Sequence, residues 1–359
     1  MTKLVPKLHY RAKTKQISDI VWSSDGEHLA IISRQDQLLE IIQSRRAHQV
    51  SHGVHGMSIN SVVWSPENTF IALGGGEALG EAESTMRIRR RSGVLVLDVN
   101  KQQVVRTFAT PEAVSSLAWS PHNTFMSIAA RDVIVWEVEQ NKEISKIRAK
   151  DGLAARYVGW FQDSRHILVA WSTRRQEIER TFTIHEAATG KHISSIEVDK
   201  SPRERREPLR SAMGIRSLAL APMGTSIAVS GVCLAVEDDP EAPLVGIISL
   251  IDLATGQERQ LAAGIFGRIR WGPFTESISW SHDARFVAAF GWLQSSDKFI
   301  ILDVTTSNVV VDFTVEGEQQ FEPVEKQNSP SVRALAWSPV DYRLAVATSE
   351  ACRIYQAQE

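Results

Sequence analysis

A short sequence phrase returns seven times along this chain of 359 residues, and it limits the possible folds more than any single motif does. Each copy has a small or β-branched residue, two polar positions, an apolar pair, a residue that is usually tryptophan, and then a turn. The seven copies are 17–26, 59–68, 114–123, 156–165, 215–224, 277–284 and 332–341. A unit that recurs in this way indicates a repeat architecture.

The spacing of the copies identifies the repeat. The residues in the tryptophan position are Trp22, Trp64, Trp119, Trp160, Leu220, Trp280 and Trp337. The shortest intervals, 42 residues from the first to the second and 41 from the third to the fourth, match the roughly 40–45 residues of a four-stranded propeller blade. The longer intervals predict blades that carry insertions.

The pattern within each repeat predicts an antiparallel meander of four strands. In the third repeat, 115–120, 124–130, 133–138 and 143–147 read as strands joined by connections of hairpin length. The third strand of every repeat is a nearly continuous apolar run, which is typical of a strand covered on both faces. These runs are 38–42, 94–99, 133–138, 182–187, 248–253, 299–304 and 352–357.

At these third strands the chain resembles the WD-repeat family of seven-bladed propellers. The family's terminal Trp-Asp pair is nearest at Trp136-Glu137, and relaxed forms are Leu97-Asp98, Ile251-Asp252, Leu302-Asp303, His185-Glu186 and Tyr355-Gln356. The Gly-His signature is not clearly present, so the repeats are degenerate. The resemblance implies a ring closed by an N-terminal strand that completes the last blade. Residues 7–12 are the predicted closing strand, because only three strands follow residue 331.

We therefore expect an all-β chain forming a single closed seven-bladed propeller over residues 1–359. The predicted blades are 17–52, 59–108, 114–148, 155–199, 215–261, 277–315 and 332–357. With 43% hydrophobic residues and a formal net charge of −2, composition is that of a globular protein without a global attraction to nucleic acid or membrane. Two cysteines, no apolar leader and no long apolar stretch predict an intracellular, cytoplasmic protein without a membrane span.

The predicted insertions share one position in the repeat. In the family, the second-to-third-strand loops and the connections between blades lie on one face. The long segments expected there are 74–93, 199–214, 231–246, 262–276 and 316–331. Loops on a rigid frame are common places for binding sites, so this face is the expected binding face.

One inserted segment, 262–276, combines aromatic residues with arginine, the types enriched at interface hot spots. It predicts partner-binding anchors at Phe266, Arg268, Arg270, Trp271 and Phe274. The alternative is that its aromatic side chains fold down as a lid over the channel or a neighbouring blade. Steering charges are expected in two other loops, at Arg89, Arg90, Arg205 and Arg206.

Motifs for catalysis, cofactors and metals are missing from the sequence. There is no phosphate-binding P-loop, no dinucleotide-binding glycine motif, no HExxH and no pair of CxxC motifs. Gly74 to Gly76 predict a flexible loop base, and His48, His52 and His55 lack further metal ligands. The segments 185–193 and 252–257 faintly resemble quinoprotein repeats, but a hairpin turn whose acidic residue accepts amide hydrogen bonds explains them better.

These observations favour a non-enzymatic scaffold, without a cofactor or metal, that binds protein partners as part of an intracellular assembly. Two alternatives remain open. The arginine-rich loops would suit nucleic acid or another anionic ligand, although carboxylates beside each arginine cluster would weaken its field. A propeller enzyme would instead place several acidic residues or histidines at the mouth of the central channel.

Overall fold

The computed structural model describes residues 3–13, 17–33, 37–45, 49–53, 57–76, 92–173, 178–198, 215–234, 244–269, 277–293, 296–315, 332–348 and 351–358. By its internal packing the chain divides into two compact units. One comprises residues 1–20, 177–180 and 196–359, and the other comprises residues 21–176 and 181–195. All regular structure in the described residues is β-strand.

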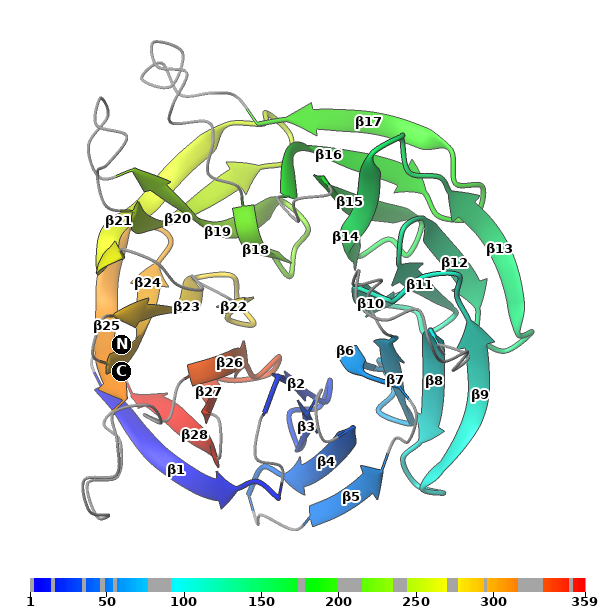
Figure 1. Ribbon diagram of the computed structural model, residues 1–359. Coiled ribbons are helices and arrows are strands. Elements are labelled where there is room, and N and C mark those ends of the chain that lie inside the picture. Colours follow the sequence, from blue (N-terminus) through cyan, green and yellow to red (C-terminus); the bar gives the residue numbers. More distant parts are fainter. Residues whose placement is uncertain are drawn as a thin grey trace, which may run out of the picture. The chain divides into compact units, whose positions relative to one another are not determined.

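The first four blades are antiparallel meanders in chain order (Figure 1). Blade one is β2 (Asp19–Trp22), β3 (His28–Ser33), β4 (Leu38–Gln43) and β5 (Gln49–Gly53). Blade two is β6 (Ile59–Trp64), β7 (Phe70–Gly75), β8 (Gly93–Asp98) and β9 (Gln103–Ala109). Blade three is β10 (Ser116–Trp119), β11 (Phe125–Ala129), β12 (Val133–Glu137) and β13 (Lys142–Ile147). Blade four is β14 (Leu153–Trp160), β15 (His166–Thr173), β16 (Ile178–Glu186) and β17 (His192–Glu197).

Blades five and six repeat the same order. Blade five is β18 (Ile215–Leu220), β19 (Ser226–Leu234), β20 (Leu244–Asp252) and β21 (Glu258–Ile269). Blade six is β22 (Ser277–Trp280), β23 (Phe286–Leu293), β24 (Ser296–Asp303) and β25 (Asn308–Val315). A single residue pair, Ile178 with Ile215, links β16 of blade four to β18 of blade five.

Blade seven is built from both ends of the chain. It contains β26 (Val332–Trp337), β27 (Arg343–Thr348) and β28 (Ala351–Gln358), and β1 (Lys3–Arg11) is its fourth strand. β1 runs antiparallel to β28, from the pair Lys3–Gln358 to the pair Arg11–Ala351 (Figure 1). The prediction of an N-terminal strand in the last blade is confirmed, and so is the all-β, seven-bladed propeller fold.

The repeated phrase forms the first strand and first turn of each blade. Exactly five residues separate the first strand from the second in all seven blades. The serine after the tryptophan holds this turn, since the hydroxyls of Ser65, Ser120 and Ser281 each accept the N–H five residues later at 2.9 Å. The left-handed conformation in the turn, φ 60° at Asn123 for example, explains why asparagine and glycine recur there.

The repeated tryptophan joins one blade to the preceding blade. The indole Nε1–H of Trp160 donates to the Ala118 carbonyl at 3.1 Å, and that of Trp280 donates to the Ala219 carbonyl at 2.9 Å. Both acceptors lie in the first strand of the preceding blade. Each indole therefore hydrogen-bonds at its polar end while it packs in the apolar layer between two blades.

The outermost strands carry a second connection between blades. Arg106 in β9 donates from Nε to the Val138 carbonyl at 3.0 Å, and Arg259 in β21 donates from Nη2 to the Val304 carbonyl at 2.7 Å. The Ser145 hydroxyl in β13 donates to the Ala187 carbonyl in the same way. Each acceptor lies in the turn between the third and fourth strands of the next blade, so adjacent blades are tied at their outer edge as well.

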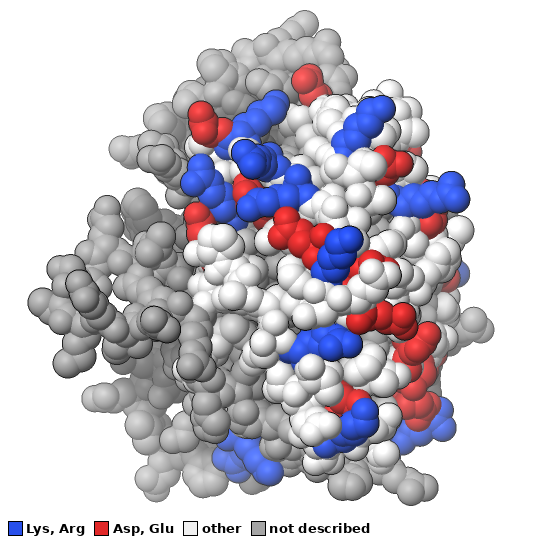
Figure 2. Space-filling view, turned by 90° about the vertical axis from the view of Figure 1, so that its right-hand side faces the viewer, with Lys and Arg blue, Asp and Glu red and all other residues white. Residues whose placement is uncertain are grey.

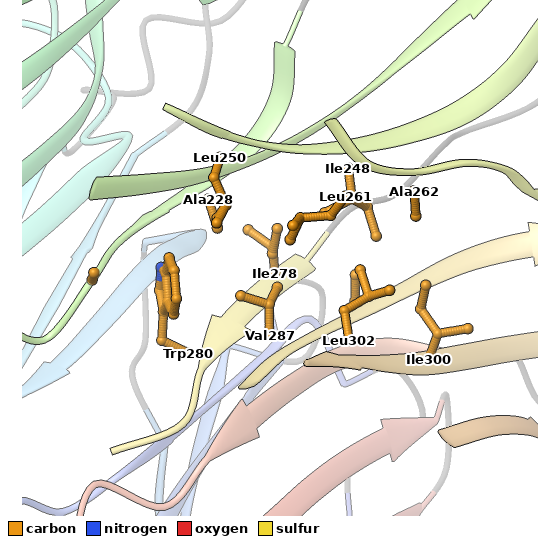
Figure 3. Close-up of a cluster of buried hydrophobic side chains, with 12 residues drawn as sticks. Ala228, Ile248, Leu250, Leu261, Ala262, Ile278, Trp280, Val287, Ile300 and Leu302 are labelled. Carbon is orange, nitrogen blue, oxygen red and sulfur yellow. The ribbon is translucent and has the colours of Figure 1, made fainter. Parts of the chain in front are cut away.

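Apolar side chains fill the space between facing sheets. Between blades five and six, Ile248 and Leu250 of β20 lie opposite Ile278 of β22 and Val287 of β23, with Trp280 at one side (Figure 3). The third strands are buried as their sequence predicts: four consecutive residues of β4 are buried, and so are five of the six residues of β8.

The structure corrects the interpretation of Gly74 to Gly76 as a flexible loop base. Gly74 and Gly75 are the last residues of β7. A Cβ atom on Gly75 would lie 1.9 Å from the Ser58 carbonyl oxygen, and Gly76 has a φ of 131°. Glycine is needed here because neighbouring backbone comes too close for any side chain.

Two predicted loops are partly strand. The two ends of the predicted loop 231–246 are strand, because β19 and β20 stay paired as far as the pair Leu234–Leu244. The predicted loop 262–276 is strand up to Ile269, because β21 continues along β20 as far as the pair Ile269–Leu244. Gly264 to Gly267 lie opposite Gly246 alone, and this irregularity hides the strand from a sequence reading.

Asp19 in β2 supports a prediction about pH. Burial raises the pKa of its carboxyl from 3.8 to about 6, against a hydrogen bond from the Ile20 N–H. The folded chain thus holds this proton more tightly than the unfolded chain, and the resulting stability is lost as pH rises through about 6. Asp19→Asn should raise the free energy of unfolding at pH 7.5 by up to about 3 kcal/mol, with no gain near pH 4.

Urea unfolding at the two pH values measures this effect. Asp163→Asn is the matched control, because the pKa of Asp163 is held below its ordinary value and its replacement should lower stability at pH 7.5. A gain from Asp19→Asn that is equal at both pH values would show that ionisation is not the cause.

Candidate functional site

Most of the predicted partner-binding residues lie outside the described part of the chain. Phe266 and Arg268 fall within β21, where the backbone of Arg268 pairs with Val245 of β20. The others lie outside the described residues: Arg89, Arg90, Arg205, Arg206, Arg270, Trp271 and Phe274. The prediction that 262–276 is a binding loop, with a folded lid as the alternative, therefore stays a prediction.

The acidic Thr-Gly segments form the turns that the sequence indicates. Asp252 Oδ1 accepts the N–H of Ala254 at 3.0 Å and both the N–H and the hydroxyl of Thr255 at 2.8 Å. The Thr255 side chain, followed by these amides, lowers the pKa of Asp252. In blade four, Thr189 Oγ1 donates to Glu186 Oε2 at 2.5 Å. Both acidic residues thus serve the hairpin between the third and fourth strands.

His185 takes the place of the tryptophan in the Trp-Asp pair and is only partly satisfied there. It is 6% exposed, and its Nδ1 lies 3.2 Å from the Gly190 carbonyl, while its Nε2 has no hydrogen-bond partner. Burial lowers the pKa of this imidazole, and His192 nearby acts in the same direction. Within the described residues no cluster of three or more metal-ligating side chains occurs; His48 and His55 lie outside that part of the chain.

The described surface has a hollow rich in polar side chains between two turns. This turn groove, about 470 Å³ in volume, lies between the first turn of blade three and the first turn of blade four. Its lining is His122, Thr124, Phe125, Asp163, Ser164, Arg165 and His166. The groove is at the end of the blades where the turns are short, opposite to the predicted insertions.

Hydrogen bonds between the two turns fix the shape of the turn groove. The Ser164 hydroxyl accepts the His122 N–H at 3.1 Å, which ties blade four to blade three. Ser164 itself is buried and has a φ of 52°, so its turn is held in the left-handed conformation. Beneath the turns, the ring of Phe125 stacks on Trp160, with centroids 6.1 Å apart and planes at 10°. The floor of the groove is therefore aromatic.

Asp163 is fully engaged by its own turn. Its Oδ1 accepts the backbone N–H groups of Arg165 at 2.8 Å and His166 at 3.0 Å, and its Oδ2 lies 2.6 Å from His166 Nδ1. Burial opposes ionisation of this carboxyl, but these hydrogen bonds outweigh it and hold the pKa of Asp163 below its ordinary value. The carboxylate keeps its negative charge, but the hydrogen bonds of its own turn already occupy both of its oxygens.

Two other polar side chains of the turn groove, those of Arg165 and His122, are less engaged. Within the described residues, neither the Arg165 guanidinium nor the His122 ring has a hydrogen-bond or ion-pair partner. The guanidinium groups of Arg285 and Arg343, by contrast, are paired with Asp303 and Asp341. Within the described residues the groove therefore holds a guanidinium that makes no ion pair, beside an aromatic ring.

The sequence analysis missed this groove. Its residues come from two copies of the repeated turn, PHNTF at 121–125 and QDSRH at 162–166, which read separately as turn chemistry. The available signal was the departure of the fourth copy from the Ser-Pro form of its neighbours, since only this copy places an arginine and a histidine at the end of the turn. Their proximity to His122 follows from blade packing, which the sequence does not give.

The outer surface of the described blades has mixed charge. In Figure 2, which is turned toward the right-hand side of Figure 1, Lys and Arg side chains lie among Asp and Glu rather than in one field. Lys101 pairs with Asp98 at 3.1 Å and Lys146 with Asp132 at 3.2 Å. Such interspersed pairs are typical of a solvated or partner-facing surface and not of a nucleic-acid track.

Comparison with known proteins adds no relative. No protein-family model matches the chain, and no curated protein matches it significantly. In the described residues, no helix is long and apolar enough to cross a membrane. The fold and the described surface are therefore the basis for a functional proposal.

Proposed function

We propose that this chain is a non-catalytic interaction scaffold of the WD-repeat type, a subunit or adaptor of an intracellular assembly. Its partners would be proteins, bound through the inserted segments at one end of the blades. Propeller folds commonly serve as frames for protein interaction. Charged and aromatic residues in loops on such a frame can bind a partner without any catalytic group.

One observation supports this proposal: the connections between strands have nearly constant length at one end of the blades and vary in length at the other end. The turn between first and second strands has five residues in every blade, and the described turns between third and fourth strands have four or five. At the other end, 17 residues separate β7 from β8, 17 separate β17 from β18, and 16 separate β25 from β26. Long inserted segments at one end only are expected when binding loops are built on a frame of constant structure.

The test compares partners recovered with wild-type protein and with a Trp271→Ala, Phe274→Ala double variant, by quantitative affinity purification. We expect at least one partner to be recovered about tenfold less, because truncating an aromatic anchor typically costs 2 kcal/mol or more. Met223→Ala, Val340→Ala is the matched control: both residues are exposed, at 71% and 48%, in the short turns of blades five and seven.

The outcomes separate the candidate functions. Equal recovery of every partner by the folded anchor variant would contradict the assignment of the anchors. Retention on heparin that falls steeply with salt would favour nucleic-acid binding through the arginine-rich loops instead. If the anchor variant and the control lose partners equally, the loss is not specific to the inserted segments.

A further inference from the structure

We propose that the turn groove between blades three and four is a second binding site, which takes a carboxylate side chain of an acidic peptide segment in a partner protein. This surface is at the constant end of the blades, so it is separate from the inserted segments and does not depend on them. Its occupant is identified by charge, by the donors that are left free, and by the aromatic floor.

Charge selects an anion. Of the ionisable groups that line the groove, Asp163 is the single acid, and His166 with two backbone N–H groups already satisfies it. Arg165 and His122 add donors without partners in the described residues. A guanidinium offers a planar pair of N–H donors that matches a carboxylate, and such a pair gives both energy and direction.

The donors that remain select a carboxylate over a phosphate. Phosphate sites are commonly built from several converging backbone N–H groups. Here those groups are already used: the N–H groups of Arg165 and His166 bind Asp163, and that of His122 binds Ser164. A single guanidinium and one imidazole suit a ligand with two oxygens and one negative charge.

The floor and the openness of the groove select a peptide over a free small anion. Phe125 supplies an aromatic surface beside the cation and is supported from below by Trp160. In an extended peptide, side chains two positions apart lie on the same face, so an apolar side chain at that spacing from an acidic one would cover this ring while the acidic one reaches Arg165. The turns are fixed by hydrogen bonds before binding, so little conformational entropy is lost when the peptide arrives.

Glu137 limits how many acidic residues the site accepts. In the register of β11 and β12 it lies opposite Phe125, and Gln140 binds its carboxylate at 3.0 Å. A peptide with an acidic residue at every position would bring a second carboxylate toward Glu137 and be repelled. A peptide with a single acidic residue and an apolar residue two positions away avoids this repulsion.

The experiment titrates the full-length protein with a hexapeptide that has aspartate at position 2, leucine at position 4 and serine elsewhere, so that both side chains lie on one face of the extended peptide. The comparison peptide carries asparagine in place of the aspartate. Affinity is measured by calorimetry, and the position of binding is taken from amide NMR shifts of Ser164 and His166. We expect the aspartate peptide to bind at least tenfold more tightly than the asparagine peptide and to shift both amides.

Variants identify the group that binds. Arg165→Ala should weaken the aspartate peptide about tenfold or more, and Arg165→Lys should recover only part of the loss, since lysine lacks the planar pair of donors. Arg131→Ala is the matched control, because Arg131 is an exposed arginine of the adjacent blade three, at the end opposite to the turn groove, between β11 and β12. Both replaced side chains are exposed, and thermal melts would check that the three variants fold.

Four results would overturn the proposal. They are no binding of the aspartate peptide, equal binding of the asparagine peptide, an equal loss with Arg131→Ala, and no loss with Arg165→Ala. Inorganic phosphate that displaces the peptide at a concentration below that needed for acetate would assign the groove to a phosphorylated ligand and would also contradict the carboxylate assignment.

Discussion

Deleting residues 1–11 is expected to lower the apparent Tm by about 4 °C or more and to make the protein self-associate. The deletion removes β1, so β28, from Ala351 to Gln358, keeps its pairing with β27 but loses the strand on its other edge. Tyr10, which is 7% exposed, no longer covers the blade. An unpaired edge next to buried residues such as Ile354 is a template for pairing with another chain. A loss of about 3 kcal/mol or more would give a shift of this size.

Thermal melts and light scattering measure both effects, and a synthetic peptide of residues 1–13 provides the control. Added in excess to the truncated protein, the peptide should restore most of the lost Tm, because it can pair with β28 as β1 does. A truncated protein that stays monomeric with an unchanged Tm would show that the edge of β28 needs no cover.

Replacing Trp280 with alanine is expected to lower the free energy of unfolding by about 3–5 kcal/mol. The side chain is 8% exposed and packs with Ile278 and Val287 in the layer between blades five and six (Figure 3). Trp280→Phe keeps most of the apolar contact and loses the bond from Nε1 to the Ala219 carbonyl. Its cost should be about 1–2 kcal/mol.

Trp337→Phe is the matched control for the hydrogen bond. Trp337 is 4% exposed in the equivalent position of blade seven, but its Nε1 has no hydrogen-bond partner. The phenylalanine change should therefore cost less at Trp337 than at Trp280, as measured by urea unfolding. Equal costs at the two positions would mean that the indole stabilises the blades by packing alone.

The blade pattern could be predicted from sequence because it depends on local chemistry that returns in each repeat. In the structure, the repeated phrase forms the first strand and first turn, and the apolar third strands are buried, as in β4 and β8. The closing strand was also predictable, since the last repeat lacks one strand and residues 7–12 supply an unassigned one. The structure extends this strand to Lys3–Arg11.

The parts that sequence reasoning missed depend on contacts between distant segments. The strand character of 262–269 comes from pairing with β20, and the run from Gly264 to Gly267 conceals it. The need for glycine at Gly75 comes from the Ser58 carbonyl in the preceding strand. The turn groove needs two turns from different blades, and nothing within either turn reveals the other. The anchors at 270–276 remain a prediction from residue type.

The pairing of β1 with β28 also affects how the protein is made. β1 leaves the ribosome first among the strands and must wait for β28, the last strand in the chain. At 5–20 residues per second this wait lasts roughly tens of seconds. During that time β1 is a free strand in the cell, and its Pro6, Lys7 and Arg11 are residue types that discourage pairing with other chains. If synthesis stopped anywhere before Ala351, β1 would have no strand to pair with. An incompletely synthesised chain would therefore expose an unpaired β1.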